Sequence, residues 1–303
     1  MDNTEIMADI KELKRKKGAL IVAHNYQIPD VQDIADFTGD SLELAKKIAV
    51  APEKLIVFCG VKFMAETAKI LAPDKKVLLP RKDAGCPMAD MVTAQEVRNY
   101  REKYPQAAMV GYVNTNAETK MELDVCVTSA NAVDIVKKLP QKQIVFVPDR
   151  NLGYWVQKNC PEKEIILHQG FCIVHEAFKR ADLDGIRKKY PNAKIVVHPE
   201  CPPEVVDIAD EVASTAGMLK YIEAHKELKE FVIGTEEGHI YKMQKLRPDA
   251  KFYSLGEAKI CVNMKKTRLE DVLEALEKEQ YEIHLSEEII RKAKAPIQKM
   301  VSM

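Results

Sequence analysis

Three cysteines of this 303-residue chain occupy matching places in a repeated sequence pattern. Cys86, Cys172 and Cys261 follow one another at intervals of 86 and 89 residues. One thiolate from each of three repeats predicts a metal group on a pseudo-threefold axis, held by three ligands and with one coordination position open. Because a metal with an open coordination position can bind substrate and act as a Lewis acid, the pattern indicates catalysis.

Polar residues recur with the same period. The triplets that begin the pattern are His24-Asn25-Tyr26, Tyr112-Val113-Asn114 and His198-Pro199-Glu200. Seventeen residues after the start of each triplet comes a hydroxyl, and five residues before each hydroxyl comes an aspartate: Ser41 with Asp36, Ser129 with Asp124, Thr215 with Asp210. Apolar triplets keep step at 56–58, 144–146 and 231–233. A period near 87 residues is too long for a solenoid and predicts three duplicated domains.

The elements that must position these residues are predicted to alternate between strands and helices. We expect helices at 6–16, 41–50 and 63–71, and strands at 19–23, 55–58, 76–79, 108–113, 143–147, 164–167, 194–197, 231–233 and 251–253. Such alternation is typical of the α/β class and predicts three homologous three-layer αβα domains arranged around a pseudo-threefold axis. Ligands bind beyond the carboxyl ends of parallel strands, where the polar triplets and the cysteines lie.

The predicted domains cover residues 1–92, 93–179 and 180–303. The tail after Cys261 contains a predicted helix at 269–278 and a strand-like segment at 281–285. Because this order resembles the opening of another repeat, we expect the tail to pack back on the first domain.

Composition excludes several classes of protein. Lys plus Arg and Asp plus Glu number 46 each, so the chain has no basic field that would attract nucleic acid. No apolar stretch approaches the ~20 residues that span a bilayer, and the acidic N-terminus lacks the apolar core of a signal peptide. We therefore expect a cytoplasmic enzyme whose seven cysteines are thiols or metal ligands.

The identity of the metal group stays open at this point. Three thiolates hold zinc or an iron–sulfur cluster, but structural zinc sites use short Cys-x-x-Cys spacings, which this chain lacks. An electron-transfer cluster takes four cysteines. The candidates for a fourth ligand are Cys59, Cys126, Cys160 and Cys201, none of which repeats with the period.

The remaining polar residues have two interpretations each. Ser41, Ser129 and Thr215 each begin a predicted helix, so their hydroxyls cap the helix, help its free N–H groups to bind an anion, or do both. The histidines His24, His175 and His198 suit proton transfer or carboxylate binding, or are structural. Around one cavity, Tyr26, Asn114 and Glu200 would supply a proton donor, an orienting amide and a general base.

At these residues the chain resembles the quinolinate synthase family over essentially its whole length. The resemblance is carried by Ala23-His24-Asn25-Tyr26-Gln27, Gly39-Asp40-Ser41, Tyr112-Val113-Asn114, Thr128-Ser129-Ala130-Asn131-Ala132, His198-Pro199-Glu200-Cys201 and Cys261-Val262-Asn263-Met264-Lys265. It implies a 4Fe–4S cluster with three cysteine ligands, matched by Cys86, Cys172 and Cys261, and one open iron. It also implies condensation of iminosuccinate with dihydroxyacetone phosphate to quinolinate, and contact with the enzyme that supplies iminosuccinate.

The resemblance also implies roles for individual residues. Tyr26 and Glu200 are expected to carry acid–base steps, with His24 and His198 assisting. The expected substrate-binding residues are His24, Ser41, Tyr112, Val113, Asn114, Ser129, His175, His198, Pro199, Glu200, Thr215 and Met264. Two alternatives remain: an iron–sulfur hydro-lyase that acts on a single hydroxyacid, and an iron–sulfur electron carrier or sensor.

Overall fold

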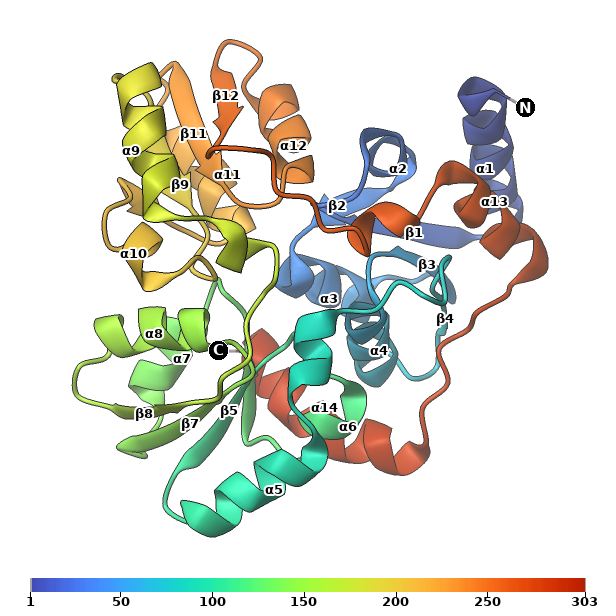
Figure 1. The fold of residues 1–303 in the computed structure, drawn as a ribbon. Helices are drawn as coiled ribbons and strands as arrows, with labels where there is room; N and C mark the ends of the chain where they lie inside the picture. Colours follow the sequence, from blue (N-terminus) through green and yellow to red (C-terminus); the bar gives the residue numbers. More distant parts are fainter. Residues whose placement is uncertain (1, 303) are drawn as a thin grey trace.

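Three small parallel sheets form the frame of the protein. The computed structural model describes residues 2–302. Its sheets have the strand orders β2-β1-β3-β4, β6-β5-β7-β8 and β10-β9-β11-β12, and every neighbouring pair is parallel. Figure 1 shows the three lobes around a common centre. The repeated strand order confirms the predicted α/β class with three αβα units.

The first unit contains α1 (Asn3–Lys17), β1 (Ala19–His24), α2 (Pro29–Ile34), β2 (Phe37–Gly39), α3 (Ser41–Val50), β3 (Leu55–Cys59), α4 (Lys62–Leu71), β4 (Lys76–Leu78) and the 3-10 turn η1 (Pro87–Met91). The second contains α5 (Ala94–Lys103), β5 (Ala108–Tyr112), α6 (Ala117–Lys120), β6 (Val125–Val127), α7 (Ala132–Lys138), β7 (Gln143–Val147), α8 (Arg150–Asn159), β8 (Glu164–Leu167) and η2 (His175–Ala177).

The third unit contains α9 (Arg180–Lys189), β9 (Lys194–Val197), α10 (Pro203–Val206), β10 (Glu211–Val212), α11 (Thr215–Ala224), β11 (Glu230–Gly234), α12 (Gly238–Leu246), β12 (Lys251–Ser254) and η3 (Met264–Lys266). The tail contains α13 (Leu269–Lys278) and α14 (Glu287–Ser302). The boundaries at residues 92/93 and 179/180 stay a prediction.

Each sheet has a short edge strand that the sequence patterns did not predict. These strands are β2, β6 and β10, and the repeated aspartates stand directly before them. The carboxylates of Asp36, Asp124 and Asp210 accept the backbone N–H of Ile21, Met109 and Ile195 at 2.9, 2.7 and 2.8 Å. The backbone N–H of each aspartate donates in return to the carbonyl of the same residue. The repeated aspartate is therefore a structural residue that fastens the edge strand to its neighbour.

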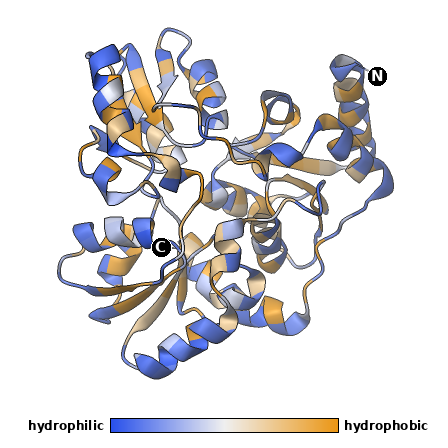
Figure 2. Cartoon of the chain, viewed as in Figure 1, coloured by the Kyte–Doolittle hydropathy of each residue, from blue (hydrophilic) through white to orange (hydrophobic). Residues whose placement is uncertain are grey.

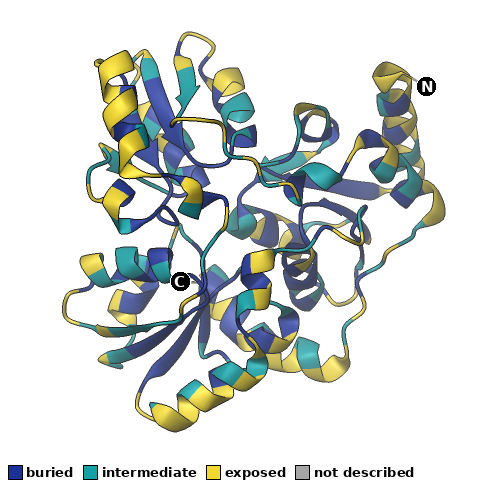
Figure 3. Ribbon diagram, in the orientation of Figure 1, coloured by how far each residue is buried: buried dark blue, intermediate teal, exposed yellow. Residues whose placement is uncertain are grey.

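The central strands are buried because helices cover both faces of each sheet. Figure 2 shows apolar residues along the strands and polar residues on the outer helices, and Figure 3 shows that the outer faces of α5 and α9 are exposed. Strands β1, β3 and β5 are buried at every position. Such continuous apolar runs are typical of parallel sheets. Within residues 2–302, no helix is both long and apolar enough to cross a bilayer.

The three units contact one another in a cyclic manner. A helix that follows the third strand of each sheet contacts the segment between the first and second strands of its neighbour. Glu66 of α4 accepts the N–H of Ala117 at 3.0 Å, and Asn151 of α8 donates to the carbonyl of Glu200 at 3.0 Å. The carbonyl of Gly238 in α12 accepts from Gln32 at 3.1 Å. These contacts turn the carboxyl ends of all three sheets toward the centre of the molecule.

The C-terminal tail differs from its prediction in one part. Helix α13 has its predicted bounds and packs on α1. The predicted strand at 281–285 is wrong, because this segment forms only an isolated antiparallel bridge between Glu282 and Leu78. The unpredicted helix α14 then packs against α4, α6 and β6, between the first and second units. It buries Ala293, Pro296, Ile297 and Met300, whose spacing of three and four residues forms one apolar face.

Replacing Ile297 with alanine should destabilise the protein by about 2–5 kcal/mol. Ile297 is fully buried in the apolar cluster that also includes strands of the first and second sheets. Its loss would leave a cavity where the tail holds the two units together. The denaturation midpoint in urea measures the change, and the exposed neighbour Gln298→Ala is the matched control. Equal midpoints for the two variants would show that α14 does not contribute to stability.

Candidate active site

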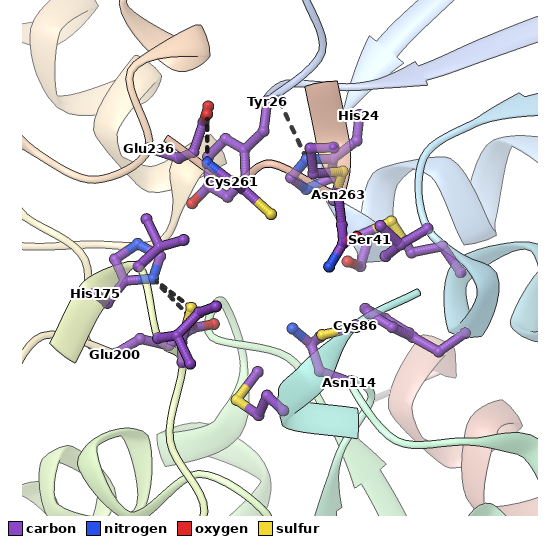
Figure 4. A pocket seen from close by; sticks show the side chains of 18 of the residues that line it. His24, Tyr26, Ser41, Cys86, Asn114, His175, Glu200, Glu236, Cys261 and Asn263 are labelled. Atoms are coloured by element: carbon purple, nitrogen blue, oxygen red, sulfur yellow. Dashed lines mark hydrogen bonds and ion pairs between the residues drawn. The ribbon is translucent and has the colours of Figure 1, made fainter. Parts of the chain in front are cut away.

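The three predicted metal ligands and most of the predicted polar residues line one cavity at the centre of the molecule. The cavity has a volume of about 130 Å³. Its lining includes Cys86, Cys172 and Cys261, and also His24, Tyr26, Ser41, Tyr112, Asn114, Ser129, His175, His198, Glu200, Thr215 and Met264. Two predicted substrate-binding residues, Val113 and Pro199, are buried beside it and do not line it. Figure 4 shows how the side chains converge from all three units.

The cavity lies where strand polarity places it. His24 and Tyr112 are the last residues of β1 and β5, and His198 follows β9. Each cysteine lies in the loop beyond the last strand of its unit, and a 3-10 turn begins one to three residues after it. Because the carboxyl ends of parallel strands lie at one sheet edge, residues some 60 positions apart in each repeat meet there.

The three cysteines have equivalent local surroundings. In each unit the backbone N–H of the third residue after the cysteine, from Ala89, His175 and Met264 respectively, favours the thiolate and opposes the rise in its pKa. Such N–H groups stabilise a thiolate ligand. Burial raises the pKa of Cys86 to about 12 and also raises the pKa of the other two thiols, so binding a metal group releases their protons.

These surroundings fit a three-cysteine cluster better than a single metal ion. One tetrahedral ion with Zn–S bonds of ~2.3 Å needs its sulfurs within about 4 Å of one another. Among residues 2–302, the only trio whose ligand atoms all lie within 4.8 Å is Cys172, His175 and Glu200, not the three cysteines. A multi-iron cluster accepts thiolates that are further apart. All seven cysteines lie in the described part of the chain, and Cys59, Cys126, Cys160 and Cys201 do not line the cavity.

The three repeated hydroxyls are not helix caps. The side chains of Asp40 and Ser214 cap α3 and α11, and Thr128 accepts the N–H of Ala130 at 3.3 Å before α7. In each unit the residue just before the repeated hydroxyl therefore takes the local role. This leaves Ser41, Ser129 and Thr215 on the cavity wall, which corrects the capping interpretation and favours anion binding.

Two histidines are neutral donors with a defined tautomer. The Nδ1 atoms of His24 and His198 accept the backbone N–H of Tyr26 and Glu200, at 3.2 and 3.3 Å. The proton of each neutral ring therefore sits on Nε2, and that of His198 points to Ser129 Oγ at 3.1 Å. Burial lowers the pKa of both rings to about 3.

Glu200 is the carboxylate at the centre of the polar network. Burial opposes its ionisation, but His175 and the Tyr112 hydroxyl hold its pKa below the ordinary value. His175 Nδ1 lies 2.8 Å from Oε2, and the Tyr112 hydroxyl donates to Oε1 at 2.5 Å. Glu200 is therefore ionised at neutral pH and can act as a general base.

Tyr26 has the opposite electrostatic character. Burial and the nearby Glu200 raise the pKa of its phenol well above 10, so Tyr26 keeps its proton and is suited to act as an acid. Its hydroxyl lies 2.7 Å from Thr235 Oγ1, which also lies 2.8 Å from His175 Nε2. Thr235 thus links Tyr26, through His175, to Glu200.

The sequence patterns missed Thr235, Asp149 and Glu236. Asp149 and Glu236 are completely buried carboxylates. Each lies three residues after the end of the aligned apolar triplet of its unit, at the position that Val61 holds in the first unit. Both residues therefore recur at one position of the repeat, and this recurrence is the sequence signal that identifies them. No repeat position identifies Thr235, because its hydrogen-bond partners, Tyr26 and His175, belong to the two other units.

The cluster-free protein should lose stability as the pH falls from 7 to 5. Burial lowers the pKa of His24, His198 and His239 to about 3, whereas unfolded histidines titrate near 6.5. Below pH 6.5 the unfolded chain binds protons that the folded chain excludes, so the free energy of unfolding falls. Each histidine contributes on the order of 1–2 kcal/mol at pH 5.

Urea unfolding at pH 7, 6 and 5 measures this effect. The variant His239→Gln should show a shallower decline, because Gln retains a donor for the carbonyl that His239 contacts at 3.0 Å but takes up no proton. A variant with the wild-type slope would contradict the assignment of a neutral, buried His239.

Comparison with known proteins gives one consistent family. The family model described as NadA, quinolinate synthetase A protein, matches residues 8–302. The quinolinate synthase of Caldicellulosiruptor bescii is 54% identical over 302 residues, which cover 99% of both chains. The quinolinate synthase of Thermotoga maritima is 51% identical over 296 residues, which cover 97% of this chain and 98% of the relative. By its similarity to these proteins over its whole length, the chain belongs to the quinolinate synthase family of enzymes.

Proposed function

We propose that the protein condenses iminosuccinate with dihydroxyacetone phosphate to form quinolinate. One C–C bond and one C–N bond join the two substrates, and atom balance requires that phosphate and two water molecules leave. The observation that carries the proposal is the meeting of three repeated cysteines and three repeated hydroxyls at one cavity. That combination suits a metal group together with a substrate that carries several anionic oxygens.

Cys86, Cys172 and Cys261 would hold a 4Fe–4S cluster. When bound, the cluster supplies a Lewis-acidic iron with an open coordination position. The roles of the chain's own residues follow from their chemistry. Ser41, Ser129 and Thr215 would bind carboxylate or phosphate oxygens through their hydroxyls, close to the N-termini of α3, α7 and α11.

The proton transfers are divided between two residues with different protonation states. Glu200, as the ionised group, would accept a proton from a substrate carbon or nitrogen. Tyr26, as the protonated group, would donate one to a leaving oxygen. The neutral His24 and His198 would assist as Nε2–H donors to substrate oxygens.

Asn114 and Tyr112 would orient the substrates. Oδ1 of Asn114 is buried and, within the described chain, has no hydrogen-bond partner, although the residue lines the cavity. A buried acceptor without a partner is costly, so a bound donor such as the substrate imine N–H would stabilise it. The hydroxyl of Tyr112 keeps Glu200 in place.

The cellular context is part of the same proposal. We propose that the enzyme works in the cytoplasm and receives iminosuccinate from the enzyme that makes it. An imine hydrolyses in water, so a short path between the two enzymes would protect it. Neither nucleic acid nor a membrane surface is a proposed partner, in keeping with equal numbers of basic and acidic residues.

An anaerobic assay tests the function. Iron-replete protein is incubated with iminosuccinate generated in situ and dihydroxyacetone phosphate, and quinolinate and phosphate are quantified. We expect equal amounts of both products and none when either substrate is omitted. No quinolinate from iron-replete protein would refute the proposal, and turnover of a hydroxyacid without triose phosphate would favour the hydro-lyase alternative.

A further inference from the structure

A buried ion pair stands between the loop that carries Cys261 and the loop that carries Tyr26. The side chain of Glu236 is 0% exposed and that of Lys265 is 13% exposed, and Lys265 Nζ lies 2.9 Å from Glu236 Oε1. Glu236 lines the cavity, and Figure 4 shows it beside Cys261. Neither residue has a part in the proton transfers described above.

Each charged atom of the pair has a further partner. Glu236 Oε1 accepts the backbone N–H of Cys261 at 3.1 Å, and Oε2 accepts the N–H of Gly238 at 2.8 Å. Lys265 Nζ donates to Oε2 at 3.0 Å and to the backbone carbonyl of Tyr26 at 2.7 Å. One ion pair therefore joins a cluster ligand, the start of α12 and the backbone of the proposed acid.

The ion pair packs closely against Gly238. A Cβ atom on Gly238 would lie 2.4 Å from Lys265 Nζ and 2.9 Å from both Glu236 Oε2 and the Tyr26 carbonyl. Such distances are far below van der Waals contact, so only glycine lets the ammonium reach both partners. Gly238 therefore makes space for the ammonium between Glu236 and the Tyr26 carbonyl.

The arrangement is specific to the third unit. Asp149, the counterpart of Glu236, likewise accepts the backbone N–H of the residue two places on, from Asn151 at 2.8 Å. The residue four places after Cys172 is Glu176, however, and Asp90 holds that place after Cys86. A lysine therefore occurs at this place only in the third unit. A general requirement of the repeat would have placed it in all three.

We propose that the Glu236–Lys265 pair is a positioning device that holds Cys261 and Tyr26 at a fixed separation. Glu236 fixes the backbone of the cluster ligand, and Lys265 connects this anchor to the backbone of the acid. A metal group on Cys261 and the phenol of Tyr26 then reach the same substrate. The consequence for catalysis rests on the proposed function, whereas the mechanical connection does not.

Three variants distinguish the contact between Glu236 and Cys261 from the contact between Lys265 and Tyr26. Lys265→Met removes the ammonium and leaves Glu236 buried without a counter-ion. The double variant Glu236→Gln/Lys265→Met removes the charge as well, while the amide oxygen of Gln still accepts the Cys261 N–H. Lys278→Met is the matched control, since Lys278 pairs with Glu274 on the exposed face of α13.

Amide hydrogen exchange of the cluster-free protein, read by mass spectrometry, is the direct test. In Lys265→Met we expect exchange at least about tenfold faster in the peptides that contain the amide of Cys261 and residues 25–28. In the double variant the exchange rate of the Cys261 peptide should return to within about threefold of wild type. The exchange of residues 25–28 should stay fast, because the Tyr26 carbonyl still lacks its hydrogen-bond donor. Lys278→Met should match wild type in both peptides.

The cluster-loaded enzyme supplies the second readout. The double variant should retain wild-type iron content and a KM within about threefold of wild type, while kcat falls at least about tenfold, because only the alignment of Tyr26 has changed. Wild-type exchange rates in both peptides of Lys265→Met would overturn the proposal, whatever the activity. If Lys265→Met does not fold, the double variant decides: unchanged exchange at 25–28 overturns the proposal and faster exchange supports it. Failure of wild-type protein to make quinolinate would refute the function but leave the exchange test intact.

Discussion

The variant Cys86→Ala should yield colourless protein with almost no bound iron and at least about 1,000-fold less activity than wild type. Two remaining thiolates hold a cluster weakly, because metal affinity grows with the number of anionic ligands fixed in place by the fold. Apart from Cys172 and Cys261, no cysteine of the described chain lines the cavity, so none can replace the lost ligand. Iron content, visible absorption and quinolinate formation under anaerobic conditions measure the effect.

The control for this prediction is Cys160→Ala. Cys160 is buried at the end of α8, and its thiol donates to the carbonyl of Val133 at 3.7 Å. This variant should keep wild-type colour and iron. A Cys86→Ala protein with wild-type iron content would contradict the three-cysteine site, and loss of iron in Cys160→Ala would indicate a fourth ligand.

The variant Tyr26→Phe should keep the colour and iron of the wild type and lose activity by about 100- to 10,000-fold, the range for loss of a positioned general acid. The ring itself is needed for packing, since it lies edge-on to the His24 ring at 4.6 Å between centroids. Phenylalanine preserves that contact and removes only the hydroxyl group with its hydrogen bond to Thr235. Steady-state kinetics and the visible spectrum distinguish the two effects.

A matched control is Tyr241→Phe. Tyr241 is a surface residue whose hydroxyl donates to Asp33 at 2.7 Å. This variant should keep full turnover, because its hydroxyl lies outside the cavity. Full turnover by Tyr26→Phe would show that another group donates the proton. A parallel loss of iron would show instead that Tyr26 supports the cluster.

The repeat register predicted much of the fold, and its failures have local causes. The predicted strands at 143–147, 164–167 and 194–197 agree with β7, β8 and β9 at both ends. The strands that were missed, β2, β6 and β10, have only two or three residues, too few for a periodic pattern. They depend on side-chain bonds from Asp36, Asp124 and Asp210 across the sheet.

The tail shows the same limit of local patterns. The segment 281–285 alternates between apolar and polar residues, as a strand does, but it reaches the sheet at a single bridge. Helix α14 contains Pro296 well within its length, which argues against a helix from sequence alone. Its packing between two units outweighs this local preference.

For the site, the sequence by itself determined which residues face a common edge. The direction of a parallel strand is encoded locally, so residues just past its carboxyl end share one side of the sheet, and an intramolecular repeat places three such sets in register. Cys86, Cys172 and Cys261 follow from this reasoning without any contact being known.

Only the tertiary structure decided how those residues are protonated and connected. The Nε2–H tautomer of His198, the link from Tyr26 through Thr235 to His175, and the Glu236–Lys265 pair all depend on burial or on contacts between distant segments. Tyr26 and Thr235, for example, are separated by 209 residues. Hydrogen bonds and desolvation act over a few ångströms in space, so no pattern along the chain records them.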